Sequence, residues 1–529
     1  MTGRIAIDFG TSNTVIARWD DLRSQGEIHH LPEYGRFLGH DSDRISVIPS
    51  LIHYTTDKRQ WIGNQVIQRG LYQSPRTFRW MKRYIGNRSP VKVRLDEREI
   101  TPYLAGQDFL TTVLIILAQE LELKDEEVAF SVPVEAYEHY ENWLTSVAEN
   151  AGLNRFRLID EPSAAALGYG AHIQPGSVYL VFDFGGGTMH AAVVRMEEDP
   201  SAKNGRRCRV LGKAGRDIGG SAIDQWIFED VLASNQREDS EETIRRLSNA
   251  ILVECERMKE ELSFKEQVDF TLMNPDTGEI ITAEFTRNRF EEILDAHDLL
   301  AQVNGVIRSA INKARERGYD EDAISAVLMV GGSSLIPAVQ KTVRTLFGKD
   351  RVFHQHPFDA IARGAAAFAA GMDFFDHIQH DYAIRYINPE TGKYEYHPLV
   401  ERGTAYPTEA SVARLAVKAA FDGQNQLGLA IFEMGDPKTT RRDGVELVFD
   451  PGGAARIVPI SADDHEQRTL FWMNEHSPTF LHAAPPAARG EPRFDVEFYI
   501  DQNKRLTITA RDMITGKQIY NQFPVVRLT

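Results

Sequence analysis

A short pattern that could hold phosphate groups occurs twice in the chain. Residues 5–13 read IAIDFGTSN, and residues 180–188 read LVFDFGGGT. Each copy is an apolar run that predicts a buried strand, followed by an aspartate and a glycine-containing turn with a hydroxyl residue. Glycine lets backbone N–H groups converge on phosphate oxygens, because no Cβ stands in the way. An aspartate at the end of such a strand can hold Mg²⁺, which takes few protein ligands and keeps several waters.

The duplication is what gives this pattern its weight. A strand followed by a glycine turn is common, so either copy alone would be a weak signal. Two copies in equivalent contexts favour a pair of hairpins that clamp a polyphosphate from both sides. The lysine signature of the P-loop, GxxxxGK, does not accompany them, so the sequence predicts a different way of binding phosphate.

Two further motifs fall in a consistent order along the chain. Residues 159–166 (IDEPSAAA) follow a predicted strand and open a helix, and residues 327–333 (VLMVGGS) form another strand that ends in glycines. The second pair of glycines would allow a nucleoside to approach the backbone closely.

The elements that must position these motifs alternate between strands and helices over the first two-thirds of the chain. Residues 178–182 and 326–330 predict apolar strands, and residues 107–121 predict a helix. This alternation indicates an α/β architecture. The alanine-rich residues 361–371 predict a closely packed helix that stops at Gly371.

The sequence pattern changes after Gly371. The short acidic stretch that follows predicts a linker, and from Tyr382 onward short strands alternate with turns rich in glycine, proline and asparagine. Residues 494–500 and 506–510 alternate between apolar and polar side chains, which predicts a hairpin with one wet face. We therefore expect a β-sandwich domain of about 150 residues here.

Composition limits the classes of protein that fit. The chain has 529 residues, which predicts two or three domains, and its net charge of −16 disfavours nucleic acid and anionic membranes as partners. Its two cysteines cannot form a disulfide framework. The N-terminus reads directly into the first predicted strand, and no apolar run is long enough to span a membrane, so we expect a cytoplasmic protein.

Together the motifs resemble the ATPase domain shared by actin, sugar kinases and the seventy-kilodalton heat-shock chaperones. Several short motifs look specifically like the chaperone branch, and the resemblance extends almost to the end of the chain. They are Lys82-Arg83, Val132-Pro133, Glu161-Pro162, Gly219-Gly220, CERMK at 255–259, PPAARGEP at 485–492 and RDMITGK at 511–517.

The resemblance implies a fold and a set of partners. It implies a two-lobed actin-like ATPase domain over residues 1–372, a linker over 373–381 and a β-sandwich peptide-binding domain over 382–529 without a helical lid. The implied cofactors are ATP or ADP with Mg²⁺, and K⁺ as a further cation. The implied partners are unfolded or extended apolar peptides, co-chaperones and a nucleotide-exchange factor, with no nucleic acid and no membrane.

It also implies a role for individual residues. Asp8 and Asp183 would position Mg²⁺, Lys82 and Glu161 would orient the attacking water, and Thr188 would lie near the γ-phosphate. The catalytic set is Lys82, Glu161, Asp183 and Thr188. The implied nucleotide-binding residues are Asp8, Gly10, Thr11, Ser12, Asn13, Gly185, Gly186, Gly187, Gly219, Gly220, Glu256, Lys259, Ser263, Gly331, Gly332 and Ser333.

The chain departs from the family pattern near this site. His190 stands where the family usually has an aspartate near the waters of the metal, which predicts a weaker metal site. Glu260 and Leu335 replace two arginines that flank the adenine, so we expect weaker binding or faster release of ATP. Leu429 and Ile431 match the apolar peptide cleft of the family, but in a strand they are equally consistent with a buried core.

Three functions remain open from the sequence. The leading hypothesis is an ATP-dependent chaperone-like protein that binds apolar peptide segments. The alternative is a nucleotide-responsive scaffold with weak ATPase activity and one dedicated protein partner. A sugar kinase or filament-forming ATPase is disfavoured, because neither class needs a C-terminal β-domain.

Overall fold

The computed structural model places two compact units along the chain, Met1–Phe374 and Phe375–Thr529. Each is described by itself. The residues that the structure describes are 4–38, 44–86, 89, 91–96, 98–121, 127–133, 138–153, 155–170, 176–198, 206–275, 277–371, 373–378, 380–388, 391–434, 445–449, 455–459, 470–474, 478–501 and 504–528.

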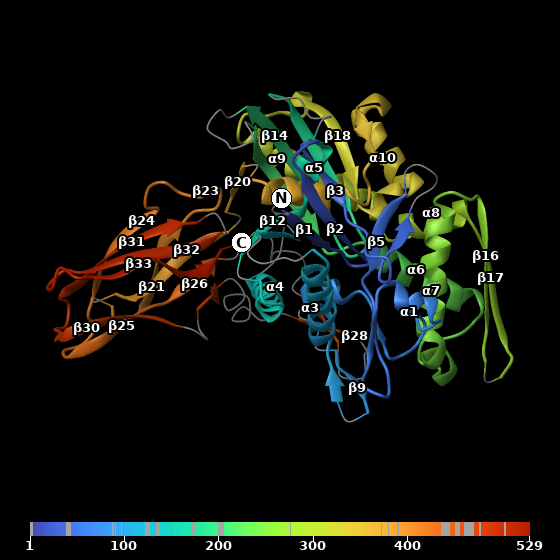
Figure 1. Ribbon diagram of the computed structural model, residues 1–529, viewed down its shortest axis with the longest axis horizontal. Helices are drawn as coiled ribbons and strands as arrows, with labels where there is room; N and C mark the ends of the chain where they lie inside the picture. Colours follow the sequence, from blue (N-terminus) through green and yellow to red (C-terminus); the bar gives the residue numbers. More distant parts are fainter. Residues whose placement is uncertain are drawn as a thin grey trace. The chain divides into compact units, whose positions relative to one another are not determined.

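The first unit contains two large sheets with the same central arrangement (Figure 1). In the first sheet, β1 (Ile5–Phe9) pairs in parallel with β11 (Val128–Val132) and antiparallel with β2 (Asn13–Asp20). In the second sheet, β13 pairs in parallel with β18 and antiparallel with β14. The repeated sequence motif is therefore the loop after the equivalent strand of each sheet. The second-sheet strands are β13 (Val178–Phe184), β14 (Met189–Glu198), β15 (Arg206–Arg216), β18 (Ile324–Val330) and β19 (Val352–Phe353).

Both predicted strands of the second sheet are confirmed, because β13 and β18 cover them. Every residue of β1 and of β13 is buried, as expected for strands that are covered on both faces. The other strands of the first sheet are β3 (Gln25–Ile28), β4 (Arg36–Leu38), β5 (Ile45–Pro49) and β12 (Phe156–Asp160). Small sheets are formed by β6 (Ile52–Tyr54), β7 (Gln60–Ile62), β8 (Thr77–Phe78), β9 (Val93–Leu95), β10 (Arg98–Ile100), β16 (Gln267–Met273) and β17 (Ile280–Thr286).

Helices complete a separate hydrophobic core for each sheet. The predicted helix around residues 107–121 is α3, which packs with α4 in the core of the first sheet, and α9 packs on β14 and β15. The helices of the unit are α1 (Asn64–Gln68), α2 (Met81–Gly86), α3 (Pro102–Glu120), α4 (Glu138–Asn150), α5 (Glu161–Tyr169), α6 (Gly220–Ser234), α7 (Glu242–Leu262), α8 (Arg287–Ala296), α9 (Leu299–Arg315), α10 (Pro337–Phe347) and α11 (Ala360–Ala369), with 3₁₀ turns η3 (Glu321–Ala323), η4 (Gly332–Leu335) and η5 (Lys349–Arg351).

Two short helices, α5 and α11, cross at a very close contact between the sheets. Helix α5 contacts β13, β14 and β15 of the second sheet and also β11 and β12 of the first, whereas α11 contacts β1, β2 and β3 of the first sheet. A Cβ atom at Gly168 would lie 1.9 Å from the carbonyl oxygen of Ala360, and one at Gly364 would lie 1.7 Å from that of Ala164. Only glycine allows the two backbones to touch in this way, which explains the alanine- and glycine-rich sequence of both helices.

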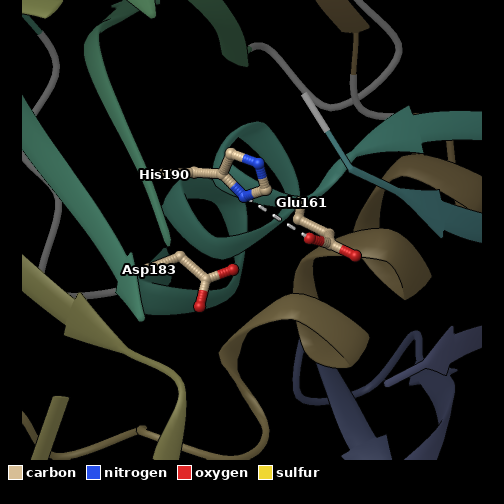
Figure 2. Close-up of side chains that lie close together, drawn as sticks. All are labelled: Glu161, Asp183 and His190. Atoms are coloured by element: carbon tan, nitrogen blue, oxygen red, sulfur yellow. Dashed lines mark ion pairs between the residues drawn. The ribbon is translucent and has the colours of Figure 1, made fainter. Parts of the chain in front are cut away.

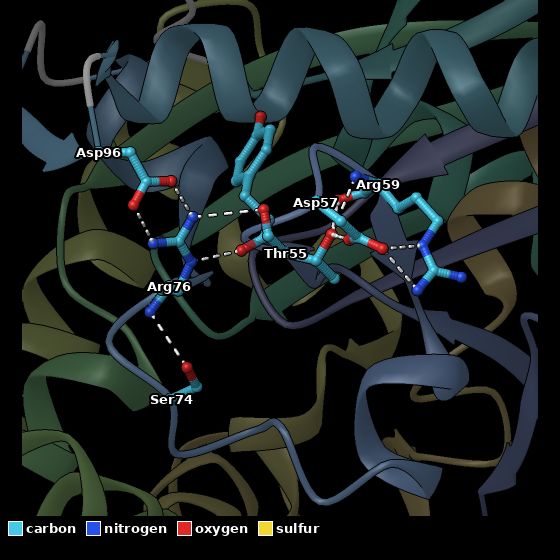
Figure 3. A network of polar contacts seen from close by, with 7 residues as sticks. Thr55, Asp57, Arg59, Ser74, Arg76 and Asp96 are labelled. Carbon is cyan, nitrogen blue, oxygen red and sulfur yellow. Dashed lines mark hydrogen bonds and ion pairs between the residues drawn. The ribbon is translucent and has the colours of Figure 1, made fainter.

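An arginine holds together the small sheets beside the first core (Figure 3). The Arg76 guanidinium binds both carboxylate oxygens of Asp96, with its nearest nitrogen at 2.7 Å, and donates to the carbonyl oxygens of Tyr54 and Thr55. Nearby, Arg59 donates to Asp57 at 2.7 Å. The bidentate geometry makes Arg76 a fixed link between the end of β6 and the β9–β10 hairpin.

The regular elements that the structure describes in the second unit are strands. Its four-stranded sheets run β22-β21-β26-β29 and β24-β31-β32-β33, and β25 pairs with β30. The predicted hairpin is confirmed as β31 and β32, although Gln502 and Asn503 of its turn lie outside the described residues. The strands are β20 (Asp373–His377), β21 (Asp381–Ile387), β22 (Tyr394–Val400), β23 (Ala405–Tyr406), β24 (Ala413–Lys418), β25 (Gln424–Leu429), β26 (Ile431–Met434), β27 (Val445–Phe449), β28 (Ala455–Pro459), β29 (Leu470–Trp472), β30 (Thr479–Ala487), β31 (Pro492–Ile500), β32 (Arg505–Asp512) and β33 (Gln518–Arg527).

Leu429 and Ile431 are buried in this unit, with 1% and 0% of their surface exposed. Each belongs to the core, which was one of the two readings that the sequence left open. The predicted linker contains β20, which pairs with β23, while its residue Gln379 lies outside the described residues. Among the helices that the structure describes, none is long and apolar enough to cross a membrane.

We predict that Gly364→Ala destabilises the first unit. The new methyl group would collide with the backbone of α5, which cannot move aside as a flexible side chain could, so we expect a loss of at least the 1–3 kcal/mol typical of overpacking. The matched control is Gly305→Ala in α9, where no atom lies within 4 Å of the new Cβ. That change should stabilise the helix by roughly 0.5–1 kcal/mol. Calorimetric unfolding of both variants measures the difference, and equal effects would exclude a tight crossing.

Candidate active site

The two Asp-Gly turns meet across a cavity of about 520 Å³ in the first unit. All the nucleotide-site residues predicted from the sequence line this cavity except Gly219 and Gly220, which lie directly behind it. A Cβ at Gly219 would lie 2.5 Å from the backbone of Gly187, and one at Gly220 would lie 2.7 Å from Ser333 Oγ. The predicted residues in the lining are Asp8, Gly10, Thr11, Ser12, Asn13, Lys82, Glu161, Asp183, Gly185, Gly186, Gly187, Thr188, Glu256, Lys259, Ser263, Gly331, Gly332 and Ser333.

Close contacts require glycine at positions 10 and 187 of the turns. A Cβ at Gly10 would lie 2.2 Å from the carbonyl oxygen of Asn13 in its own turn. A Cβ at Gly187 would lie 2.6 Å from Thr11 Oγ1 of the opposite turn. The turns therefore face each other at a separation that larger residues would not permit.

Hydrogen bonds from neighbouring elements fix the orientation of both turns. Ser50 Oγ donates to the carbonyl oxygen of Gly10 at 2.8 Å. In the second turn, the carbonyl oxygen of Gly185 accepts from Ser333 Oγ at 2.9 Å and from the backbone N–H of Gly220 at 3.0 Å. Because these carbonyl groups are engaged, the peptide groups of the turns are held in one orientation before any ligand arrives.

Three buried carboxylates converge at one end of the cavity. Asp8 and Asp183 are the penultimate residues of β1 and β13, and Glu161 opens α5. Burial raises the pKa of Asp8 to about 6, although Ser131 donates a hydrogen bond to Asp8 Oδ1 at 2.6 Å. Burial and the charge of Glu161 raise the pKa of Asp183 well above its ordinary value. Such a cluster fits a divalent cation, which would remove the repulsion between the carboxylates.

Lys82 is a cation within this cluster. It comes from α2, is buried, and its ammonium group donates to Glu161 Oε1. Burial lowers the pKa of Lys82, but the charges of Glu161, Tyr140 and Asp8 outweigh burial and raise it overall. Lys82 therefore stays charged and holds Glu161 in place. With Lys82 against three carboxylates, the acidic groups outnumber the basic one, which fits a site for a cation.

His190 is the unusual member of this group (Figure 2). It is 1% exposed and lies opposite Asp183 in the β13–β14 ladder, with its Nδ1 atom 3.8 Å from Glu161 Oε2. Burial lowers the pKa of His190, so the imidazole is neutral near pH 7. His190, which stands where the family usually has an aspartate, therefore lies among the residues that could hold a metal ion.

Helix α7 forms the other end of the cavity. Lys259 Nζ lies 2.7 Å from Asp224 Oδ1 and donates to the carbonyl oxygen of Gly220. Glu256 accepts a hydrogen bond at 2.5 Å from the hydroxyl of Tyr72, which lies in the segment between α1 and β8. Glu260 and Leu335 also line the cavity, so the two replacements seen in the sequence do lie at this end.

Sequence reasoning missed a buried ion pair behind the site. Lys213 Nζ of β15 lies 3.2 Å from Asp160 Oδ2, and both side chains are 1% exposed. Asp160 also caps α5, because its Oδ1 atom accepts from the backbone N–H of Ser163 at 3.0 Å. The cap could have been recognised from an aspartate placed before Glu161-Pro162. Nothing in the local sequence of Lys213 indicates its partner.

Comparisons with known proteins agree with this geometry. A family model described as Hsp70 protein matches residues 4–445. The chain is 27% identical to the chaperone protein DnaK of Thermotoga petrophila and to that of Thermotoga maritima, in each case over 97% of this chain and 79% of the relative. It is 26% identical to the chaperone protein DnaK of Thermotoga neapolitana over the same shares.

We predict that Asp8→Asn stabilises the protein when no divalent cation is present. The folded state raises the pKa of Asp8 from 3.8 to about 6, so its ionisation opposes folding at neutral pH. Asparagine keeps the acceptor for Ser131 and removes the charge. At about 1.4 kcal/mol per pKa unit, we expect roughly 1–3 kcal/mol of stabilisation at pH 7.5.

The sign of this change in stability can be checked by measuring the free energy of unfolding at several pH values. The difference between the two proteins should vanish below pH 3.8, where Asp8 is protonated in both states, and grow as the pH rises to about 6. Denaturant unfolding in EDTA measures it. Asp21→Asn, at a side chain that is 64% exposed, should change stability by less than about 0.5 kcal/mol. An Asp8→Asn variant that is less stable than wild type at pH 7.5 would contradict the argument.

Proposed function

Because the chain belongs to the Hsp70 protein family, a family of ATP-dependent chaperones, we propose that it binds Mg²⁺-ATP in the cavity and hydrolyses it. The observation that carries this proposal is the pair of facing Asp-Gly turns at equivalent strands of two sheets. A polyphosphate between them would meet backbone N–H groups from both turns. Asp8 and Asp183 would hold Mg²⁺, which neutralises charge on the phosphate groups.

Different residues would have different roles in the hydrolysis of ATP. Glu161 Oε1 accepts from Lys82, which holds the carboxylate where it would also accept a hydrogen bond from the attacking water. Lys82 stabilises the negative charge that develops on the transferring phosphoryl group. Thr188, at the end of the second turn, would lie beside the terminal phosphate. The ion pair between Lys82 and Glu161 would thus supply a donor and an acceptor to the reacting atoms.

The nucleoside end is formed by α7 and η4. Glu256, Lys259 and Ser263 are spaced by three and four residues, so they share one face of α7. Gly331 and Gly332 give the base and ribose a close approach to the backbone on the opposite side. Glu260 and Leu335 supply no guanidinium plane for stacking, so we propose weaker retention of the nucleotide than in relatives that carry arginines there.

For the second unit, we propose binding of extended apolar peptides. The family membership and the strand-rich architecture support this role. Leu429 and Ile431 are buried, so they could contact a peptide only if the strands around them opened. Their assignment to a peptide cleft remains a prediction. Co-chaperones and a nucleotide-exchange factor belong to the same proposal, as does K⁺ as an additional cation.

A second function is favoured by one specific observation. His190 is neutral where the family usually carries a charge, and this supports a nucleotide-responsive scaffold with weak hydrolysis and one dedicated partner. Isothermal calorimetry of ADP and ATP with and without Mg²⁺, followed by ATP turnover with a panel of unfolded peptides, separates the two functions. Peptide-stimulated turnover supports the chaperone, and binding with negligible turnover supports the scaffold. No Mg²⁺-dependent heat, or unchanged heat in Asp183→Ala, would refute both.

We predict that Lys82→Ala slows the chemical step of ATP hydrolysis by roughly 10²–10³, as is typical when one group that stabilises a transition state is lost. Single-turnover hydrolysis of pre-bound ATP measures this step without product release. Lys92→Ala is the matched control, since Lys92 is 62% exposed and pairs only loosely with Glu99 at 3.4 Å. Its rate should equal that of wild type. An unchanged rate in Lys82→Ala would remove Lys82 from the mechanism.

A further inference from the structure

Glu161, Asp183 and His190 bring one potential metal-ligand atom each to within 4.8 Å of one another (Figure 2). They come from the first turn of α5, the end of β13 and the start of β14. Asp183 and His190 are directly opposed in the antiparallel ladder, so their side chains lie on the same face of the sheet. All three side chains are buried, and their positions are set by regular secondary structure rather than by loops.

The imidazole of His190 is held with one nitrogen facing the carboxylates. Among the residues that the structure describes, Nδ1 has no hydrogen-bond partner, and its 3.8 Å separation from Glu161 Oε2 is too long for a hydrogen bond. The opposite edge of the ring lies against Gly215, where a Cβ would be 2.3 Å from His190 Cδ2. A buried nitrogen without a partner is rare in proteins, and here it points at two potential metal ligands.

One carboxylate oxygen of Glu161 faces the imidazole of His190. Lys82 occupies Oε1, so Oε2 is the atom that faces His190. A lysine that holds one oxygen of a carboxylate orients the other, as outer-shell hydrogen bonds commonly do for metal ligands. The geometry therefore offers two oxygen donors and one nitrogen donor around a common point.

We infer that this cluster binds a divalent first-row transition metal with His190 Nδ1 as a direct ligand, and that the site prefers such a metal to Mg²⁺. The inference rests on the proposed nucleotide function, because the metal would lie beside the phosphates. Mg²⁺ takes oxygen ligands, whereas imidazole suits transition metals. Ligands bound at 2.0–2.2 Å lie at most about 4.4 Å apart, so the present spacing needs only small side-chain shifts.

Pulsed electron paramagnetic resonance of bound Mn²⁺ tests the inference without measuring activity. Protein without a histidine tag is stripped with EDTA and loaded with MnCl₂, with and without ADP. We expect electron spin-echo modulation from a directly bound ¹⁴N nucleus, and a changed modulation after ¹⁵N-histidine labelling. The modulation should disappear in His190→Asp. It should persist in His354→Asp, the same substitution at an exposed histidine outside the cavity.

Competition between the two metals gives the second measurement. His190→Asp should lower the preference for Mn²⁺ over Mg²⁺ by at least about 10-fold, because the loss of even an outer-shell partner of a metal ligand typically lowers metal affinity by 10- to 100-fold. Bound Mn²⁺ without histidine modulation in the wild type, or an unchanged metal preference in His190→Asp, overturns the inference. If that variant fails to fold, the labelled wild type decides alone. If the wild-type protein binds Mg²⁺-ADP by calorimetry but gives no histidine modulation, only this inference is refuted. If it binds neither metal ions nor nucleotide, the proposed function is refuted as well.

Discussion

The contact between the backbones of α5 and α11 is the constraint on which the rest of the first unit depends. Gly168 and Gly364 let the helices touch. Helix α11 packs on β1 of the first sheet, which carries Asp8, whereas α5 packs on β13 of the second sheet, which carries Asp183. The closeness of this crossing therefore sets the distance between carboxylates that belong to different sheets. The packing of α5 against α11 therefore determines how far apart the carboxylates of the site lie.

The negative charge of the buried carboxylates in the cavity is only partly balanced by the positive charge of Lys82. The protein buries Asp8, Asp183 and Glu161 together and provides Lys82 as their nearby cation. Buried like charges oppose folding, so the hydrophobic cores on both sides must supply the stability that the site costs. A ligand that brings positive charge relieves this repulsion, and binding and stability are therefore linked at this position.

The sequence predicted those parts of the structure that depend on local pattern. The turns after β1 and β13 were recognisable because their motif is repeated. The strands and α3 followed from the pattern of apolar residues, and α11 followed from its alanine-rich composition. Contacts between distant residues were not recognisable. Tyr72 and Glu256 are separated by 184 positions, and neither has a neighbour that indicates the other. A pattern of side chains can place a residue on one face of a strand, but Leu429 shows that it does not reveal what covers that face.

The two thiols of the chain, Cys208 and Cys255, are both fully buried. Burial raises the pKa of Cys255, which further suppresses the reactive thiolate. Cys255 precedes Glu256 on α7, so it becomes reachable only when this helix leaves its neighbours. The rate at which an alkylating reagent modifies Cys255, separated from Cys208 by peptide mapping, is then a direct record of local opening beside the cavity. No engineered label is needed, because the molecule carries its own reporter.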